Sequence, residues 1–325
     1  MEAASVATPA GLRRTRPLGD RIGDAVLHAV TALAALLGVA VVLAIVWRVF
    51  VGAWPAIKVF HLSFLWHNVW NAPLNQFGAR DLIVGTLVTS FGAMLLSAPL
   101  SIAIALFLSE LAPPAVRGPV GTLVEMLAAV PSVVVGLWGI FVLAPFDAQH
   151  VQPFLSSFLG WIPIFSGGQD KVESTVFTAI VVLTIMTIPI TTSICRELFL
   201  GVPDDLEEAS IGLGATRWEM VRTVILPTVR GGVVAAVILG LGRALGEAIA
   251  VSQVIGNFIP LQRSIFQPGD TLASRVAGQY QGAITNLQIS ALIYLALILL
   301  VITFIANLAA QRIVKRFEFQ RTGGS

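Results

Sequence analysis

The chain has 325 residues, of which 56% are hydrophobic and only 12% carry a charged side chain. Its mean hydropathy is +0.86, whereas soluble globular proteins have about 25% charged residues. The formal net charge of +2 is too small to indicate a nucleic-acid-binding protein. The single cysteine, Cys195, excludes an intramolecular disulfide and a cysteine metal site. The composition therefore predicts an integral membrane protein.

Long apolar runs are distributed along the chain. A membrane helix needs about 20 mostly apolar residues. Six stretches reach that length, at about 26–51, 82–109, 120–144, 174–195, 231–256 and 284–311. The first is longer than the apolar region of a cleavable signal peptide, so we expect it to be retained. Pro131 predicts a kink in the third.

These runs predict an all-α membrane protein with six transmembrane helices. Its parts would be a basic N-terminal segment (1–25), a six-helix domain (26–311) with a long loop (196–230), and a basic tail (312–325). If both ends are cytoplasmic, the inner segments carry 13 Lys and Arg residues and the outer segments 6. Because cytoplasmic loops are enriched in basic residues, we expect both termini inside a bacterial plasma membrane.

Aromatic residues gather in the predicted outer segments. They include Trp54, Phe64, Trp66, Trp70 and Trp161. Such rings usually anchor a protein at the membrane boundary, and we favour that interpretation. The alternative is contact with an external partner.

Glu125 lies about one helical turn inside the third apolar run. Because a charged side chain at membrane depth is costly and often functional, Glu125 is a candidate for a substrate pathway. The alternative is a carboxylate that reaches the cytoplasmic boundary near Arg117.

The loop 196–230 predicts two short helices. Asp204 is placed to cap the first, Gly212 and Gly214 to end it, and Thr216 to cap a second that continues toward Pro227. A helix that lies on lipid headgroups favours basic residues on its polar face. This loop instead opens with four acidic residues. A protein partner therefore fits it better than a membrane surface does.

The fifth run contains G-L-G-R-A-L-G-E, which places Arg243 and Glu247 one helical turn apart. A charge at membrane depth costs at least ~2.5–3.5 kcal/mol on insertion scales, so an ion or substrate pathway is the favoured interpretation. The alternative is a purely structural ion pair. We expect Gly240, Gly242 and Gly246 to let neighbouring backbones approach closely.

The loop also carries a family motif. Glu208, Ala209 and Ser210 are followed by Gly214 at the fourth position after Ser210, and by V-I-L-P, which ends at Pro227. This spacing resembles the EAA loop of ABC importer permeases, with Ser210 in place of the second alanine of that motif. The resemblance implies that the loop docks on a cytoplasmic ATPase through Glu207, Glu208, Ala209, Ser210, Gly214, Leu226 and Pro227.

The run around Arg243 is similar to the phosphate-specific permeases of the Pst system, the PstC family of subunits. Residues 77–90, 127–139 and 271–277 support the same resemblance, which covers about residues 60–316. Ala248 departs from the family pattern, where threonine is common. The resemblance implies a type I (MetI-like) importer fold and inorganic phosphate as cargo. It implies four partners: a PstA-like permease subunit, two PstB-like ATPase subunits and a PstS-like external phosphate-binding protein.

The residue types suit that cargo. A guanidinium presents a fixed fork of donors that matches an oxyanion and keeps its charge. Arg243 could therefore accept phosphate, while Glu247 holds the arginine when no anion is present. With Glu125, these residues form the predicted substrate pathway.

No motif for ATP hydrolysis is present, because a P-loop needs Gly-Lys followed by Ser or Thr and none of the 3 lysines follows a glycine. We therefore expect a transport subunit that is not itself an enzyme and needs no cofactor or metal. Two alternatives remain open. One is an ion-coupled secondary transporter or channel for anions, and the other is an ABC permease for sulfate or molybdate.

Overall fold

The computed structural model describes residues 18–322, with side chains from 22 to 314. The chain divides into two units, Met1–Arg48 and Val49–Ser325. In the first unit the described residues form the beginning of α1 (Leu18–Phe60), and none of its apolar window is buried within the chain. Much of the predicted basic segment 1–25 lies outside the described residues.

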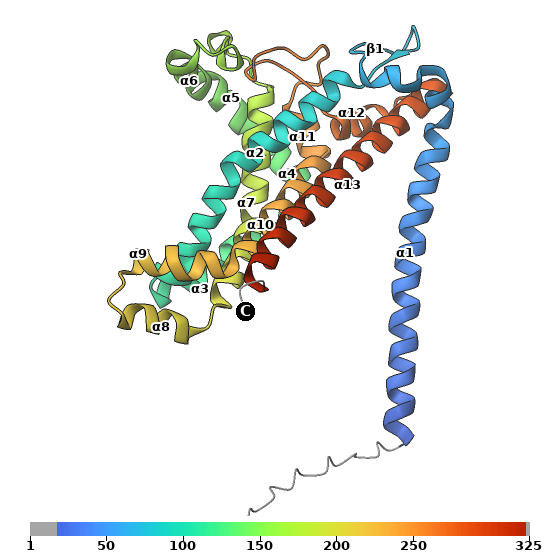
Figure 1. Cartoon of the computed structure of the whole chain (residues 1–325). Helices are drawn as coiled ribbons and strands as arrows, with labels where there is room; N and C mark the ends of the chain where they lie inside the picture. The colour runs from blue at the N-terminus through green and yellow to red at the C-terminus, as the bar shows by residue number, and fades with distance from the viewer. Residues whose placement is uncertain (1–17, 323–325) are drawn as a thin grey trace, which may run out of the picture. The chain divides into compact units, whose positions relative to one another are not determined.

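The second unit is almost entirely helical (Figure 1). Its longer helices are α2 (Arg80–Leu106), α3 (Pro114–Ala128), α7 (Val176–Leu200), α10 (Leu226–Gly246) and α13 (Asn286–Thr322). Its shorter helices are α4 (Ser132–Trp138), α5 (Ala144–Phe146), α6 (Gln152–Leu159), α8 (Asp204–Gly212), α9 (Arg217–Met220), α11 (Ile249–Val254) and α12 (Leu272–Gln279). Strands β1 (Trp70–Asn71) and β2 (Gln76–Phe77) form one antiparallel hairpin, with Trp70 opposite Phe77.

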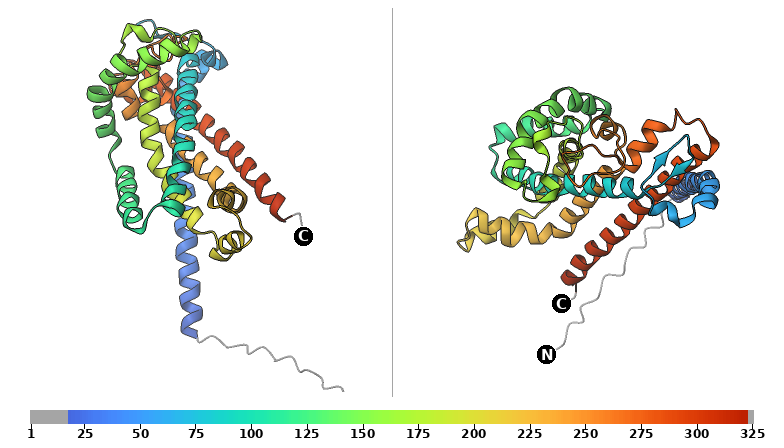
Figure 2. Two further views of the ribbon diagram at one scale, coloured as in Figure 1. Left: turned by 90° about the vertical axis from the view of Figure 1, so that its left-hand side faces the viewer. Right: turned by 90° about the horizontal axis from the view of Figure 1, so that it is seen from above.

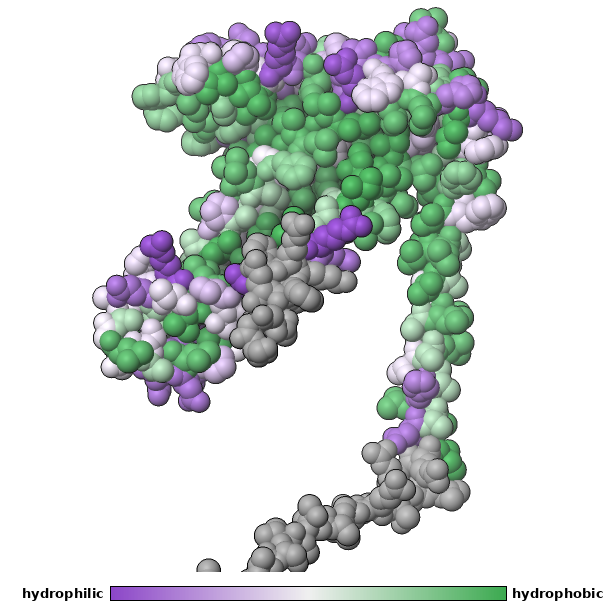
Figure 3. Space-filling view, viewed as in Figure 1, coloured by the Kyte–Doolittle hydropathy of each residue, from purple (hydrophilic) through white to green (hydrophobic). Residues whose placement is uncertain are grey.

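Six helical segments among the described residues are long and apolar enough to cross a membrane, as predicted. They are Ile22–Leu65, Arg80–Leu111, Ser132–Leu159, Val176–Leu200, Arg217–Gly246 and Asn286–Val314. In the second unit, a hydrophobic belt separates hydrophilic groups at the two ends (Figure 3). The chain is therefore a multi-pass membrane protein.

The predicted third span, 120–144, is wrong in its position. Pro131 does not kink one helix but separates α3 from α4, and the spanning segment runs from Ser132 to Leu159. Proline has no N–H to donate and disfavours helical geometry in the residue before it. Both effects end α3 ahead of Pro131, and π-helical turns continue the helix after α4.

The predicted fifth span, 231–256, is also displaced. The helix starts earlier, at Arg217, passes through Pro227 and ends at Gly246. Pro227 is tolerated because it lies in the first turn of α10, directly after a π-helical turn. The second loop helix is therefore the start of this span and not a separate short helix.

Small and hydroxylated side chains lie at the interface of α2 and α7, which lie side by side (Figure 2). The buried hydroxyl residues of these two helices include Thr86, Thr89, Ser90, Ser97, Ser101, Thr184, Thr187, Thr191 and Thr192. Thr192 Oγ1 donates to the carbonyl of Ser101 at 3.4 Å, and Ser101 Oγ donates to the carbonyl of Ile188 at 3.3 Å. Because apolar burial drives little association inside a bilayer, such close, polar contacts hold membrane helices together.

The outer aromatic residues divide into two groups. Phe64 is fully buried and stacks on Tyr294 with ring centroids 4.6 Å apart. Trp70 donates from Nε1 to Gln279 at 2.7 Å. The favoured anchoring interpretation is therefore wrong for both: Phe64 packs on α13, and Trp70 fastens the hairpin to α12. Trp66 and Trp161 are largely exposed and stay candidates for membrane anchors.

Candidate functional site

Arg243 and Glu247 are adjacent in the structure, but they do not share a helix. Helix α10 ends at Gly246, Glu247 has extended backbone angles (φ −71°, ψ 117°), and α11 begins at Ile249. Nη2 of Arg243 is 3.8 Å from Oε2 of Glu247. The other carboxylate oxygen, Oε1, accepts the backbone N–H of Ala250 at 3.4 Å. Glu247 therefore pairs with the arginine and also accepts a backbone N–H from the first turn of α11.

The two side chains differ in exposure. The Glu247 side chain is 8% exposed, whereas that of Arg243 is 41% exposed. The carboxylate is held in the protein by the arginine and by the backbone. The guanidinium is therefore partly accessible from outside the chain, whereas the carboxylate is not.

Arg243 lines a cavity of about 340 Å³ and is its only charged residue. The walls come mainly from the junction of α3 and α4 and from α7, and they include Leu127, Val130, Val134, Trp138, Ile185 and Met186. An apolar wall lowers the local dielectric constant and strengthens the attraction between a guanidinium and an anion. Among the described residues that line it, the cavity thus combines one cation with an apolar wall.

The cavity lies at one helix interruption, and Arg243 reaches it from the last turn of α10, just before a second interruption. One interruption lies between α3 and α4, around Pro131, and the other between α10 and α11, at Glu247. Irregular backbone at membrane depth is tolerated where it is buried or lines a cavity. Substrate sites of membrane transporters are often built from such discontinuous helices.

The glycines near Arg243 behave differently from one another. A Cβ added to Gly240 would lie 2.7 Å from Oγ1 of Thr191, so this glycine permits the close approach of α10 and α7. Around Gly242 and Gly246 an added Cβ would meet no described atom within 4 Å. The predicted close approach is therefore confirmed at Gly240, whereas at Gly242 and Gly246 it stays a prediction, since no described residue of this chain lies against them.

Glu125 does not line the cavity of Arg243. Its side chain is 60% exposed, and Oε1 lies 3.6 Å from Nη1 of Arg196, at the end of α7. The expected neighbour, Arg117, is not its ion-pair partner. The structure thus separates Glu125 from Arg243 and Glu247, and exposed pairs of this kind contribute about 0–1 kcal/mol to stability.

The loop 196–230 forms a projection, the α8–α9 knob, at one end of the molecule (Figure 1). Pro203, and not Asp204, occupies the N-cap of α8. Helix α8 ends at Gly212 as predicted, and Gly214 has φ +92°, which favours glycine. Thr216 caps α9 through a reciprocal capping box with Glu219.

The knob exposes apolar side chains beside its acidic ones (Figure 3). Leu213 is 91% exposed, and Leu206, Ile211 and Trp218 are also exposed. Glu208, Ala209 and Gly214 are exposed as well, and Ser210 is half-buried. Large exposed apolar side chains that cluster on one projection indicate a protein-binding surface.

Glu207 lies differently from Glu208. It lines a polar cavity of about 390 Å³ between α8, α9 and the inner end of α2, with Glu110, Asp204 and Arg217 among its neighbours. Burial, and then the charges of Glu110 and Asp204, raise the pKa of Glu207 above its ordinary value. Arg217 donates to the backbone carbonyl of Glu110 at 3.3 Å, which ties α9 to the end of the second span.

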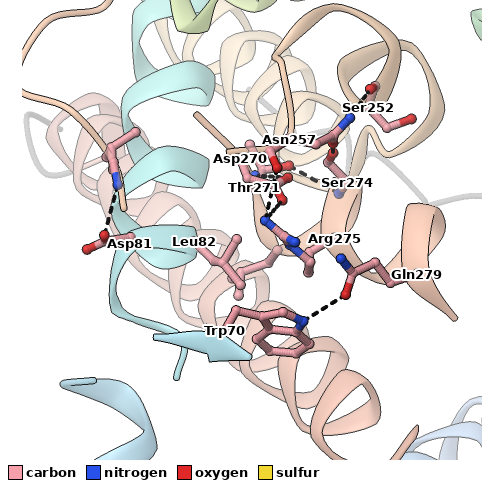
Figure 4. Close-up of polar contacts among 12 residues, drawn as sticks. Trp70, Asp81, Leu82, Ser252, Asn257, Asp270, Thr271, Ser274, Arg275 and Gln279 are labelled. Carbon is pink, nitrogen blue, oxygen red and sulfur yellow. Dashed lines mark hydrogen bonds and ion pairs between the residues drawn. The ribbon is translucent and has the colours of Figure 1, made fainter. Parts of the chain in front are cut away.

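The sequence analysis missed a buried ion pair. Nη2 of Arg275 and Oδ2 of Asp270 are 2.5 Å apart, and both residues are almost fully buried (Figure 4). Arg275 also donates to the carbonyl of Asn257 at 3.3 Å and lies over the ring of Trp70. The pair thus fixes the segment after α11 to α12 and the β-hairpin. Its only sequence signal was two opposite charges five residues apart in a segment between spans.

Comparisons with known proteins agree with this architecture. Residues 97–319 match the family model of the binding-protein-dependent transport system inner membrane component. Phosphate transport system permease protein PstC of Pasteurella multocida is 45% identical over 82% of this chain and 84% of its own length. PstC of Mesorhizobium japonicum is 40% identical over 99% of this chain and 100% of its own length.

Solved structures share the fold. An inward-facing MetNI methionine ABC transporter matches with a TM-score of 0.56 and 18% identity, covering 76% of this chain and 99% of that chain. A bacterial ABC transporter that imports the acidic polysaccharide alginate matches with a TM-score of 0.59 and 20% identity, covering 90% of this chain and 99% of that chain. The chain belongs to the family of binding-protein-dependent transport system inner membrane components, in which the relatives described above are PstC permeases.

Proposed function

We propose that this protein is a membrane-spanning permease subunit of an ATP-driven importer of inorganic phosphate. The observation that carries the proposal is Arg243, which is the one charged side chain among the described residues that line an apolar cavity beside the α3–α4 interruption. The identity of 40–45% to PstC permeases supports phosphate as the cargo. Glu125 remains part of the proposal only as a residue at the cytoplasmic mouth of the pathway.

The proposed gate follows from the two partners of Glu247. Phosphate reaches the exposed side of the Arg243 guanidinium and competes with the carboxylate for it. Because Glu247 is also held by the N–H of Ala250, it stays near the site when the anion binds. The negative charge of Glu247 then helps to expel the bound phosphate toward the cytoplasmic side. Neither the phosphate-bound nor the empty state is therefore so stable that the site remains in it.

The proposed energy source is a separate ATPase. The exposed apolar and acidic side chains of the α8–α9 knob provide the docking surface, with Glu208, Ala209 and Ser210 in α8 and Gly214 in the turn. The helix that begins in α9 continues to Gly246, three residues beyond Arg243. A displacement of the knob is therefore transmitted along one helix to the cavity. Leu226 and Pro227 lie on that connection, and Glu207 lies on the side of α8 that faces the polar cavity.

The proposed assembly contains a second, PstA-like permease subunit, two PstB-like ATPase subunits and a PstS-like external phosphate-binding protein. It lies in a bacterial plasma membrane with both termini in the cytoplasm, where the basic segments 1–25 and 312–325 would lie. The excess of Lys and Arg in the inner segments supports this orientation. The docking surface favours an ABC importer over an ion-coupled secondary transporter or channel, which has no ATPase to bind.

The test is uptake of labelled phosphate in bacterial cells that lack this chain, with and without the gene restored. We expect phosphate uptake to be lost and then recovered, while uptake of labelled sulfate and molybdate stays unchanged. If only the uptake of sulfate or of molybdate were lost, that anion, and not phosphate, would be the cargo. Co-purification without any ATPase subunit in a mild detergent would contradict the coupling proposal.

A further inference from the structure

A second apolar groove lies on the outside of the helical unit, far along the chain from the Arg243 cavity. It has a volume of about 560 Å³ and lies between the start of α2 and the side of α13. Its walls include Ile83, Val84, Val301 and Ile302, with Trp66 and Arg80 also lining it. Figure 3 shows a hydrophobic surface over this part of α13.

Arg80 is the only charged residue of the groove. It is exposed, and among the described residues its side chain makes no ion pair. The neighbouring carboxylate, Asp81, is engaged elsewhere because its Oδ2 accepts the backbone N–H of Leu261 at 2.9 Å. The groove therefore combines an apolar wall with one available cation.

The position of Arg80 in the chain fixes which end of the groove is polar. It is the first residue of the second membrane span, so it lies at the bilayer boundary. Trp66 lies beside it and is 76% exposed, as expected of a ring at headgroup level. From Tyr294 to Ile302 the groove follows α13 for about 12 Å toward the bilayer interior, at the helical rise of 1.5 Å per residue.

We propose that this groove binds one phospholipid molecule, whose headgroup phosphate pairs with Arg80 and whose acyl chain lies between α2 and α13. A guanidinium fits a phosphate by its fork of donors. The aliphatic wall fits the acyl chain. An anionic headgroup such as phosphatidylglycerol is favoured, because each arginine near an anionic membrane surface adds attraction.

A protein helix is a poorer occupant. It would cover Arg80 with apolar atoms and leave a buried charge unpaired, which is strongly unfavourable. Such a helix could come from the partner permease subunit or from residues 18–48 of this chain. Either would need its own acidic residue opposite Arg80.

Trp66 provides a direct probe, because bromine atoms on an acyl chain quench the fluorescence of an indole that they touch. The protein is reconstituted in vesicles of phosphatidylcholine that contain increasing fractions of brominated phosphatidylglycerol or brominated phosphatidylcholine. The Trp66 contribution is the difference between the wild type and Trp66→Phe. We expect phosphatidylglycerol to quench it at about a fivefold lower fraction, equivalent to roughly 1 kcal/mol for one arginine.

Three variants test whether the quenching of Trp66 comes from a lipid bound at Arg80 and in the groove. Arg80→Gln should abolish the preference for phosphatidylglycerol, and Val301→Phe, which fills the groove, should reduce quenching by both lipids. Arg263→Gln, which removes another exposed arginine that does not line the groove, should keep the wild-type preference.

Several results would overturn the proposal. Equal quenching by the two lipids, or an unchanged preference for phosphatidylglycerol in Arg80→Gln, would show that Arg80 does not select an anionic headgroup. Undiminished quenching in Val301→Phe would place the acyl chain outside the groove. Loss of Trp66 quenching in the assembled importer would assign the groove to the partner permease. If Trp66 were not quenched in the isolated chain either, part of this chain itself would cover the groove.

Discussion

Glu247 makes two contacts with one carboxylate: Oε2 lies 3.8 Å from Nη2 of Arg243, and Oε1 accepts the N–H of Ala250 at 3.4 Å. The first contact is an ion pair and the second is a hydrogen bond to the first turn of α11. Two variants distinguish the roles of these contacts. Glu247→Gln keeps an oxygen for the hydrogen bond but loses the charge, so phosphate uptake should fall while thermal stability in detergent stays near that of the wild type. Glu247→Ala should also lose about 1 kcal/mol of stability from the hydrogen bond.

The matched control removes a charge that lies far from the site. Arg312→Gln changes an exposed residue in the C-terminal part of α13, and we expect it to leave uptake and stability unchanged. Equal uptake in Glu247→Gln and the wild type would show that the carboxylate charge has no part in the gate.

Leu213→Asp tests the docking surface. This side chain is 91% exposed, so the substitution should not alter folding of the chain. An apolar side chain that becomes buried in an interface contributes about 1.5–3 kcal/mol, so ATPase co-purification should fall about tenfold or more. The measurement is the ATPase-to-permease ratio after affinity purification. An unaltered ratio would place the ATPase contact elsewhere.

Gly214→Ala tests the turn between α8 and α9. Gly214 has φ +92° with open space around its Cα, so the cost comes from backbone conformation and not from a clash. A residue with a Cβ loses roughly 1–2 kcal/mol in left-handed geometry. We expect weaker ATPase association with normal membrane insertion, whereas Gly212→Ala, also without a clash and inside α8, should be tolerated.

Glu207→Gln gives a prediction that depends on pH. Because burial and the charges of Glu110 and Asp204 raise the pKa of Glu207, ionisation in the folded state opposes the packing of α8. The variant should therefore be more stable than the wild type above that raised pKa. Its advantage should disappear as the pH falls through the raised pKa toward the ordinary value of a glutamate. Thermal unfolding in detergent across this range measures the difference, with the exposed Glu208→Gln as control.

Asp270→Ala tests the buried pair with Arg275. Removal of one partner leaves a buried charge uncompensated, which costs about 3–5 kcal/mol. We expect a large loss of thermal stability, and partial recovery when Arg275→Met is added, because the unpaired charge is then gone. A double variant no more stable than Asp270→Ala would contradict this account of the pair.

The number of spans and the capping of α9 could be predicted from the sequence, because long apolar runs and the Thr216–Glu219 capping box are local signals. The interruptions at Pro131 and Glu247 could not. A proline inside an apolar run is compatible with a kink or a break, and the outcome depends on neighbouring helices that satisfy the backbone. The extended backbone of Glu247 is stabilised by its contacts with Arg243 and Ala250, which no spacing rule anticipates.

Residues of the candidate site also differ in how far local sequence signals predict them. Arg243 and Glu247 were found because charge in an apolar run is rare. Glu125 carries the same signal, yet it pairs with Arg196 from another helix, a contact that only the tertiary structure supplies. The buried pair of Asp270 and Arg275 was missed because charges between spans look ordinary in a sequence.

The central claim is that Arg243 receives the transported phosphate. The most direct measurement is labelled phosphate uptake into vesicles that contain the complete importer and its external phosphate-binding protein, with binding-protein-stimulated ATP hydrolysis followed in parallel. For Arg243→Gln we predict uptake at least about tenfold below the wild type, from the loss of charged hydrogen bonds worth about 1.5–3 kcal/mol. ATPase association should remain intact, and Arg243→Lys should recover part of the uptake. Uptake in Arg243→Gln equal to that of Arg312→Gln and the wild type would contradict the account.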